Sequence, residues 1–158
     1  IDVKTDVLNA VTKTNDTQPL EVRNALERSV GRLLNKSILI LGLAFKAGTD
    51  DVREAPSIKI VKSLVECGSN ISAHDPQATE NFKRVTCKDN SDITFVSDWR
   101  LAVTKAEIII IVTDWQEYLE LQDCDLRGKV LFDTRNMFSP KIIEGVCYLN
   151  IGGRYLNE

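Results

Sequence analysis

Hydrophobic residues follow a helical spacing in the first 35 residues of the chain. The apolar positions there are Val3, Val7, Val11, Val22, Leu26, Val30 and Leu33. The polar stretch from Asn15 to Pro19 predicts a break between two helices. Neither helix can bury its apolar stripe alone, so this segment is expected to pack on a neighbour or to lead in from another domain.

Short apolar runs alternate with helical patterns from residue 36 onward, and Ser37 to Leu43 has the continuous apolar character of a strand buried on both faces. The expected strands are Ser37 to Leu43, Asn70 to Ala73, Ile93 to Val96, Glu107 to Val112, Lys129 to Asp133 and Val146 to Asn150. The expected helices are Ala55 to Cys67, Asp98 to Lys105, Trp115 to Leu121 and one that opens at Ser139-Pro140. Pro56 suits the first turn of its helix and Gly68 its end. Residues 77–92 are expected to be less regular.

This alternation predicts an α/β fold, a three-layer sandwich with a mainly parallel sheet and right-handed crossovers. Ligands of such sheets bind outside the carboxyl ends of the strands. The candidate functional residues are therefore those that follow the strands: Ala44 to Glu54, His74 to Gln77, Thr113 to Trp115, Thr134 to Asn136 and Gly152 to Arg154.

The length and composition of the chain indicate a single globular domain. The length of 158 residues suits about one domain, and 43% hydrophobic with 27% charged residues is typical of a globular protein. The net charge of −3 offers no basic surface for nucleic acid or an anionic membrane, so neither is expected as a partner. Because the chain begins with Ile1, we expect it to be a piece of a longer protein. The sequence shows no sign of secretion, so a cytoplasmic protein is expected. The longest apolar run, Ile108 to Val112, is too short for a membrane span.

The four cysteines and the one histidine give little support to a metal site. No Cys-x-x-Cys pair occurs, and Cys67, Cys87, Cys124 and Cys147 are expected to be reduced thiols. His74 has no nucleophile nearby in the sequence, so covalent catalysis by this chain alone is not expected.

The loop from Phe45 to Glu54 is the most informative segment. It has ten residues with five charges, whereas loops at this position usually have roughly two to six residues. Lys46 and Arg53 are suited to anionic oxygens of a ligand. The alternative is a solvated loop whose charges pair with one another.

Other strand ends carry further candidates. Arg135 is expected at the same edge as Lys46, where two cations suit a diphosphate or a base carbonyl, unless it pairs with Asp133 at the surface. Asp75 stands where dinucleotide-binding folds place a ribose-binding acid, but a turn-forming role beside Pro76 is the simpler interpretation. Trp99 and Trp115 are expected to pack in the core. The sequence has no Gly-x-Gly-x-x-Gly, so the fold is Rossmann-like without the dinucleotide fingerprint.

Five motifs in order resemble the C-terminal domain of the UDP-glucose/GDP-mannose dehydrogenase family. They are Gly42 to Ser57 (GLAFKAGTDDVREAPS), His74 to Pro76 (HDP), Ile111 to Tyr118 (IVTDWQEY), Phe132 to Asn136 (FDTRN) and Tyr148 to Gly152 (YLNIG). The resemblance implies that residues 1–35 end a helical linker and that residues 36–158 form the nucleotide-sugar-binding domain.

The resemblance also implies an activity and a set of partners. Family members oxidise the sugar of a nucleotide-sugar, such as a UDP-sugar, twice with NAD, through an intermediate bound to a cysteine in the central region. NAD is held mainly by an N-terminal domain, so both of those parts lie outside this chain. Because full-length members commonly assemble through a central helix, the parent enzyme is expected to be a homo-oligomer that contains the N-terminal and central domains.

Matched residue by residue, the resemblance implies that Phe45, Lys46 and Arg135 contact the nucleotide-sugar and that Arg53 reaches NAD. No residue of the chain matches a catalytic or metal-binding position. The Thr113-Asp114-Trp115 motif favours UDP-glucose as substrate; a UDP-N-acetylhexosamine or GDP-mannose remains an alternative. A stand-alone nucleotide-binding module without catalysis is the alternative from another class.

Overall fold

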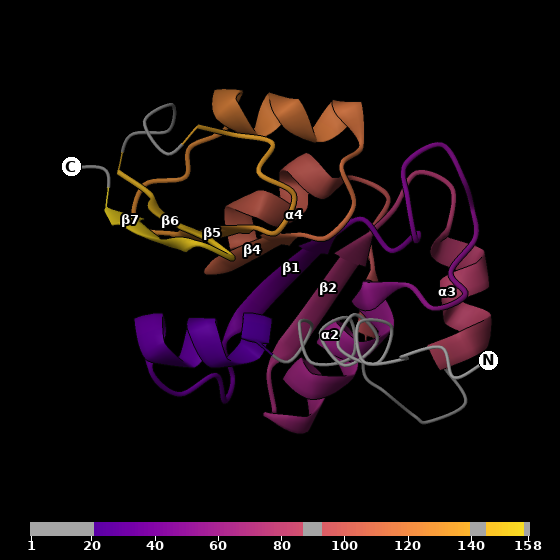
Figure 1. The fold of residues 1–158 in the computed structure, drawn as a ribbon, viewed down its shortest axis with the longest axis horizontal. Coiled ribbons are helices and arrows are strands. Elements are labelled where there is room, and N and C mark those ends of the chain that lie inside the picture. Colours follow the sequence, from indigo (N-terminus) through magenta and orange to yellow (C-terminus); the bar gives the residue numbers. More distant parts are fainter. Residues whose placement is uncertain (1–20, 87–92, 140–144, 157–158) are drawn as a thin grey trace, which may run out of the picture.

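A seven-stranded sheet forms the centre of the molecule (Figure 1). The computed structural model describes residues 21–86, 93–139 and 145–156. The strands follow the order β3-β2-β1-β4-β5-β6-β7, parallel up to β6 and antiparallel between β6 and β7. Their bounds are β1 Ser37–Leu41, β2 Asn70–His74, β3 Ile93–Phe95, β4 Ile108–Ile111, β5 Val130–Asp133, β6 Cys147–Asn150 and β7 Gly153–Leu156. The predicted α/β sandwich with a mainly parallel sheet is confirmed.

Helices cover both faces of the sheet (Figure 1). They are a helix over residues 21–30, α2 (Pro56–Glu66), α3 (Thr79–Thr86), α4 (Trp99–Lys105) and the 3₁₀ helix η2 (Gln116–Asp123). The helix over residues 21–30 and α2 pack on one face, whereas α4 and η2 pack on the other. The sheet order places the β1 and β4 ends side by side, and their loops meet at one edge.

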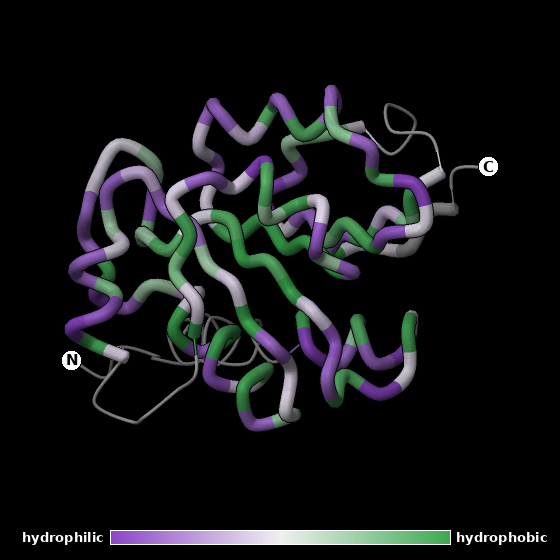
Figure 2. Tube along the Cα trace, turned by 180° about the vertical axis from the view of Figure 1, so that it is seen from behind, coloured by the Kyte–Doolittle hydropathy of each residue, from purple (hydrophilic) through white to green (hydrophobic). Residues whose placement is uncertain are grey.

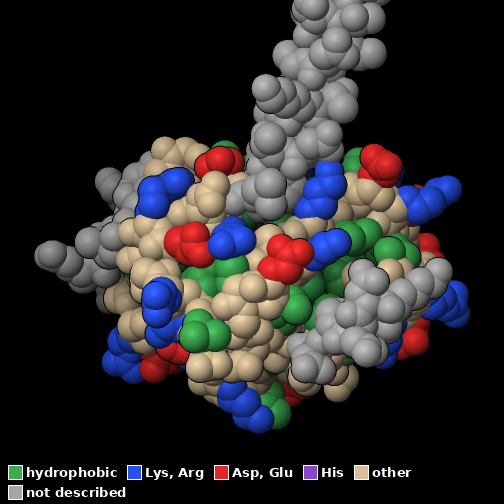
Figure 3. Space-filling model, turned by 90° about the horizontal axis from the view of Figure 1, so that it is seen from below, with side chains coloured by type: hydrophobic (Ala, Val, Ile, Leu, Met, Phe, Trp, Pro, Cys, Tyr) green, Lys and Arg blue, Asp and Glu red, His purple; other side chains and the backbone are tan. Residues whose placement is uncertain are grey.

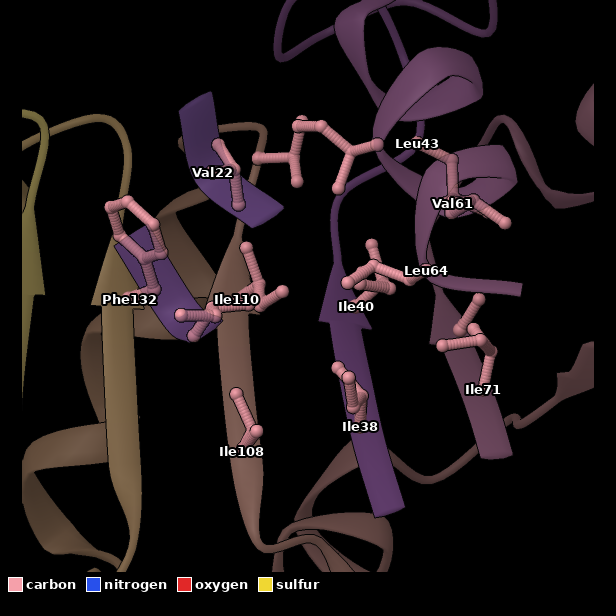
Figure 4. Close-up of a cluster of buried hydrophobic side chains, with 14 of the residues drawn as sticks. Val22, Ile38, Ile40, Leu43, Val61, Leu64, Ile71, Ile108, Ile110 and Phe132 are labelled. Atoms are coloured by element: carbon pink, nitrogen blue, oxygen red, sulfur yellow. The ribbon is translucent and has the colours of Figure 1, made fainter. Parts of the chain in front are cut away.

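Alternate residues of the buried strands supply two separate apolar clusters, one on each face. Ile38 and Ile40 of β1 face α2, while Leu39 and Leu41 face α4. Figure 4 shows Ile38 and Ile40 beside Ile108 and Ile110 of β4, all directed to the same side of the sheet. Figure 2 shows continuous hydrophobic stretches of the trace along the central strands. Burial on both faces explains why these strands read as continuous apolar runs.

Three differences from the sequence-based expectations have local physical reasons. Strand β1 ends at Leu41 because Gly42 has φ +90° and turns the chain out of the sheet. The expectation of an irregular segment at 77–92 is wrong over α3, whose sequence has few apolar residues but buries Phe82 against Phe95. Strand β7 was not expected; it returns antiparallel to β6.

Some expectations fall on residues that the structure does not describe. They are the apolar positions before residue 21, the Asn15 to Pro19 break, the helix that opens at Ser139-Pro140, and Cys87.

Cys67, Cys124 and Cys147 are free thiols. Of the helices in the described part of the chain, none has the length and apolarity needed to cross a bilayer. On the face shown in Figure 3, basic and acidic side chains are interspersed.

Candidate functional site

The long loop after β1 starts from a rigid base at the carboxyl edge of the sheet. Gly42 N–H donates to the His74 carbonyl at 2.9 Å. An added Cβ at Gly42 would lie 2.4 Å from Thr113 Cβ, so only glycine lets the chain pass the end of β4 this closely. The loop therefore leaves the sheet between the ends of β2 and β4.

Asp75 holds the first residues of this loop. Its Oδ2 accepts the backbone N–H groups of Leu43 at 2.7 Å and Ala44 at 3.0 Å, together with Nε1–H of Trp115 at 3.0 Å. Its Oδ1 accepts the N–H groups of Gln77 at 2.9 Å and Ala78 at 2.7 Å. Five donors on a buried carboxylate support the turn-forming role expected for Asp75, because both of its oxygens are already hydrogen-bonded within the protein.

The body of the loop is closed on itself and tied to a neighbouring helix. Phe45 N–H donates to the Asp51 carbonyl at 2.8 Å, and the Val52 side chain of the loop is buried in the core. Asn81 of α3 donates from Nδ2 to the Asp50 carbonyl at 3.0 Å and to its carboxylate at 2.9 Å. The loop is therefore an ordered structure, although most of its charged side chains are exposed.

Phe45 and Lys46 form the exposed part of the loop next to its base. The Phe45 side chain is 51% exposed, which is unusual for a large aromatic ring. Lys46 is exposed and has no ion-pair or hydrogen-bond partner among the described residues. An open aromatic ring beside an unpaired cation suits the base and phosphates of a nucleotide.

Arg53 lies further along the same loop and already has an anionic partner. Its Nε and Nη2 donate to the Asp51 carboxylate at 3.0 Å and 2.8 Å, and the guanidinium holds the pKa of Asp51 at about 2. The Arg53 side chain is nevertheless 87% exposed. The alternative in which the loop charges pair with one another therefore holds for Arg53. It does not hold for Lys46, which has no such partner among the described residues. Directly after Arg53, Glu54 adopts a left-handed conformation with φ 59°.

Arg135 follows β5 at the same edge of the sheet. Its Nε donates to the Val112 carbonyl at 2.6 Å, so its side chain crosses to the end of β4. The surface pair with Asp133 does not form. Asp133 is instead fully buried and accepts Arg135 N–H at 3.0 Å, Phe138 N–H at 2.9 Å and the Tyr148 hydroxyl at 2.8 Å. Asp133 therefore shapes the Arg135 loop in the way that Asp75 shapes the Phe45 loop.

Two adjacent residues at the end of β4 link Arg135 to the start of the long loop after β1. Val112 accepts the Arg135 side chain, and Thr113 Oγ1 donates to the Ala44 carbonyl at 2.6 Å. The ends of β1, β4 and β5 thus converge, as the strand-end rule predicts. Gly152 follows the end of β6. The link from there to this edge is a hydrogen bond of Asn150, which donates to Asn136 Oδ1 at 3.1 Å.

His74 is part of the support beneath this edge. The Tyr118 hydroxyl lies 3.0 Å from His74 Nδ1 and 3.1 Å from the His74 carbonyl oxygen. Burial lowers the pKa of His74 and raises that of Tyr118.

Both tryptophans contact the core as expected, Trp99 being buried against Tyr118. Within the described ranges, no three His, Cys, Asp or Glu side chains are grouped to hold a metal ion.

Sequence reasoning did not identify Ser57 as part of this edge. Its hydroxyl is fully buried and donates to the Leu43 carbonyl at 2.6 Å. A serine near the start of a helix usually caps the helix itself, so the sequence gives no signal that this hydroxyl faces the preceding loop.

The sequence matches the model of the UDP-glucose/GDP-mannose dehydrogenase family, UDP binding domain, over residues 39–140. A UDP-glucose 6-dehydrogenase of Rickettsia felis is 35% identical over 154 residues, which cover 94% of this chain and 33% of the relative. A UDP-glucose 6-dehydrogenase of Bacillus subtilis is 29% identical over 147 residues, which cover 90% of this chain and 31% of the relative. The chain thus spans about a third of the length of these relatives.

Solved structures show the same architecture. A UDP-glucose dehydrogenase from Pyrobaculum islandicum superposes with a TM-score of 0.79 at 32% identity, covering 93% of this chain and 32% of that one. A GDP-mannose dehydrogenase from Pseudomonas aeruginosa gives a TM-score of 0.74 at 20% identity, covering 96% of this chain and 35% of that one. The second likeness concerns the fold alone.

Proposed function

Because this chain belongs to the UDP-glucose/GDP-mannose dehydrogenase family, we propose that it is the C-terminal nucleotide-sugar-binding domain of an NAD-dependent UDP-glucose 6-dehydrogenase. The observation that carries the proposal is the pair Phe45 and Lys46, an exposed ring and an unpaired cation on an ordered loop at the ligand edge of the sheet. The names of the relatives, UDP-glucose 6-dehydrogenases, support UDP-glucose as substrate.

In this proposal Phe45, Lys46 and Arg135 bind the UDP-sugar. Lys46 acts as a mobile positive charge for the diphosphate, while Phe45 offers an apolar surface to the nucleotide. Arg135 is held at the end of β4 by its Nε, which leaves the rest of the planar guanidinium available for a second contact. Binding the nucleotide end would fix the sugar for oxidation to UDP-glucuronate.

The reaction itself needs parts of the enzyme that lie outside this chain. NAD, when bound, accepts a hydride in each of two successive oxidations, and the proposed cysteine nucleophile belongs to the central region. The exposed guanidinium of Arg53 fits a contact with an anionic group of NAD held by another domain. We assign residues 1–35 to the end of the linker and 36–158 to the binding domain, and we propose a cytoplasmic homo-oligomer for the whole enzyme.

Kinetics of the full-length enzyme test the role of Lys46. Lys46→Ala is expected to raise the KM for UDP-glucose about tenfold or more and to change kcat less, because the lost contact holds a remote part of the substrate. Lys62→Ala on the exposed face of α2 is the matched control and should leave both constants unchanged. Unchanged kinetics in Lys46→Ala would show that this assignment is wrong.

Two alternatives are separated by simple observations. A panel of UDP-glucose, UDP-N-acetylhexosamines and GDP-mannose, with NADH formation as the readout, identifies the sugar. A stand-alone nucleotide-binding module would be favoured by a parent gene without an upstream Gly-x-Gly-x-x-Gly and a cysteine-bearing helical segment.

A further inference from the structure

Leu43 and Ala44 connect strand β1 to Phe45 and Lys46, and all four of their backbone polar groups are bound by side chains. Both N–H groups donate to Asp75 Oδ2. The Leu43 carbonyl accepts from the Ser57 hydroxyl at 2.6 Å, and the Ala44 carbonyl accepts from the Thr113 hydroxyl at 2.6 Å. Strand β1 ends at Leu41, so beyond it these side chains take the place of the backbone hydrogen bonds between strands.

The three side chains come from three different elements. Asp75 follows β2, Ser57 belongs to the first turn of α2, and Thr113 follows β4. All three are buried, and Ser57 and Thr113 are fully so. The Leu43 side chain is itself buried, and Figure 4 shows it between Val22 and Val61 at the end of β1. We name Asp75, Ser57 and Thr113 the loop clamp.

We propose that the loop clamp is a positioning device: it fixes the direction in which Phe45 and Lys46 leave the sheet and so sets the affinity for the nucleotide-sugar. The effect on substrate rests on the proposed function of Phe45 and Lys46. The physical reason is that buried hydrogen bonds to backbone allow one conformation only, since breaking one leaves an unsatisfied group without water to replace it. A binding side chain is effective when its backbone is held within a fraction of an ångström.

Thr113 offers the sharpest test, because its hydroxyl can be removed at nearly constant volume. Thr113→Val deletes the bond to the Ala44 carbonyl, whereas Thr113→Ser keeps the hydroxyl and removes a buried methyl. In the full-length enzyme, Thr113→Val should accelerate hydrogen exchange of the Ala44 and Phe45 amides about three- to tenfold, the effect of losing one hydrogen bond. The KM for UDP-glucose should rise by a similar factor with kcat nearly constant. Thr113→Ser should retain the wild-type values of all three.

Two buried serines of α2 provide a matched pair. Ser57 donates to the Leu43 carbonyl and Ser63 donates to the Ile60 carbonyl at 2.8 Å, within the helix. Ser57→Ala and Ser63→Ala each delete one buried hydroxyl bond to a backbone carbonyl. Only Ser57→Ala should accelerate exchange at Ala44 and Phe45 and raise the KM, even where the two variants lose equal stability.

The outcomes separate the clamp from the proposed function. Unchanged amide exchange in both Thr113→Val and Ser57→Ala overturns the clamp, whatever the kinetics. Faster exchange with an unchanged KM also overturns it, because a loosened loop then has no effect on the substrate. If the wild-type enzyme neither binds UDP nor oxidises UDP-glucose, the proposed function fails, and amide exchange alone still decides whether the three side chains hold the loop.

Discussion

At the residue scale, single side chains and single glycines determine the shape of the ligand edge. Asp75 and Asp133 are buried carboxylates that accept mainly N–H groups, each at the end of a strand. Gly42 lets the chain turn against Thr113. The role of each of these residues therefore follows from the neighbours that it contacts.

The comparison of Gly42 with Gly48 separates backbone strain from steric overlap. Both have left-handed φ angles, +90° and +80°, but only at Gly42 would a Cβ overlap Thr113. Gly42→Ala should lower the free energy of unfolding by more than about 3 kcal/mol, and Gly48→Ala by about 1 kcal/mol. Urea denaturation measures both. Equal losses would contradict the close approach at Thr113.

At the element scale, two helices carry a local start signal, a proline in α2 and a capping aspartate in α4. Pro56 occupies the first turn of α2, where its missing N–H costs nothing. Asp98 caps α4, its Oδ1 accepting Leu101 N–H at 3.0 Å. Helix α3 lacks a comparable apolar pattern and depends on Phe82. The sequence thus predicts the helices whose start is marked by a residue such as Pro56 or Asp98.

The cap of α4 can be tested directly. Asp98→Ala should lower the free energy of unfolding by about 1 kcal/mol, because Leu101 N–H loses its acceptor. Asp98→Ser should recover most of that loss, since a serine oxygen accepts the same bond. The measurement is chemical denaturation of the three proteins. A serine variant as unstable as the alanine variant would argue against the cap.

At the scale of the whole molecule, burial of His74 beneath the sheet edge should make the stability of the fold depend on pH. Burial lowers the pKa of folded His74 below its ordinary value of 6.5, although Glu117 and Asp75 oppose this effect. The unfolded chain therefore binds a proton at a higher pH than the folded protein does. It follows that stability falls as the pH is lowered through the unfolded pKa.

A comparison between pH 7.5 and pH 5.5 tests this effect. The free energy of unfolding of the wild-type protein should decrease on acidification, and the decrease should be smaller in His74→Gln, which has no titrating ring. Urea denaturation at both pH values gives the two differences. A decrease of the same size in both proteins would assign the pH dependence to other groups.

The order of strands and helices was determined largely by local sequence. Buried strands such as Ile108–Ile111 are continuous apolar runs because both faces are covered, and α2 has both its proline and its terminal glycine. The strand-end rule predicts from the sequence that Lys46 and Arg135 lie at one edge of the sheet. These features depend on residues close together in the sequence.

Tertiary structure alone decided which groups support that edge. Ser57 and Leu43 are 14 residues apart, Asp75 and Leu43 are 32 apart, and Thr113 and Ala44 are 69 apart. No local pattern encodes such pairs, because a hydroxyl or a carboxylate finds its partner only after the sheet has brought the strand ends together. The same holds for α3 and β7, which have weak local signals and depend on the rest of the sheet for their partners. The sequence by itself thus determined the elements and the chemistry at their ends, and packing decided how that chemistry is held.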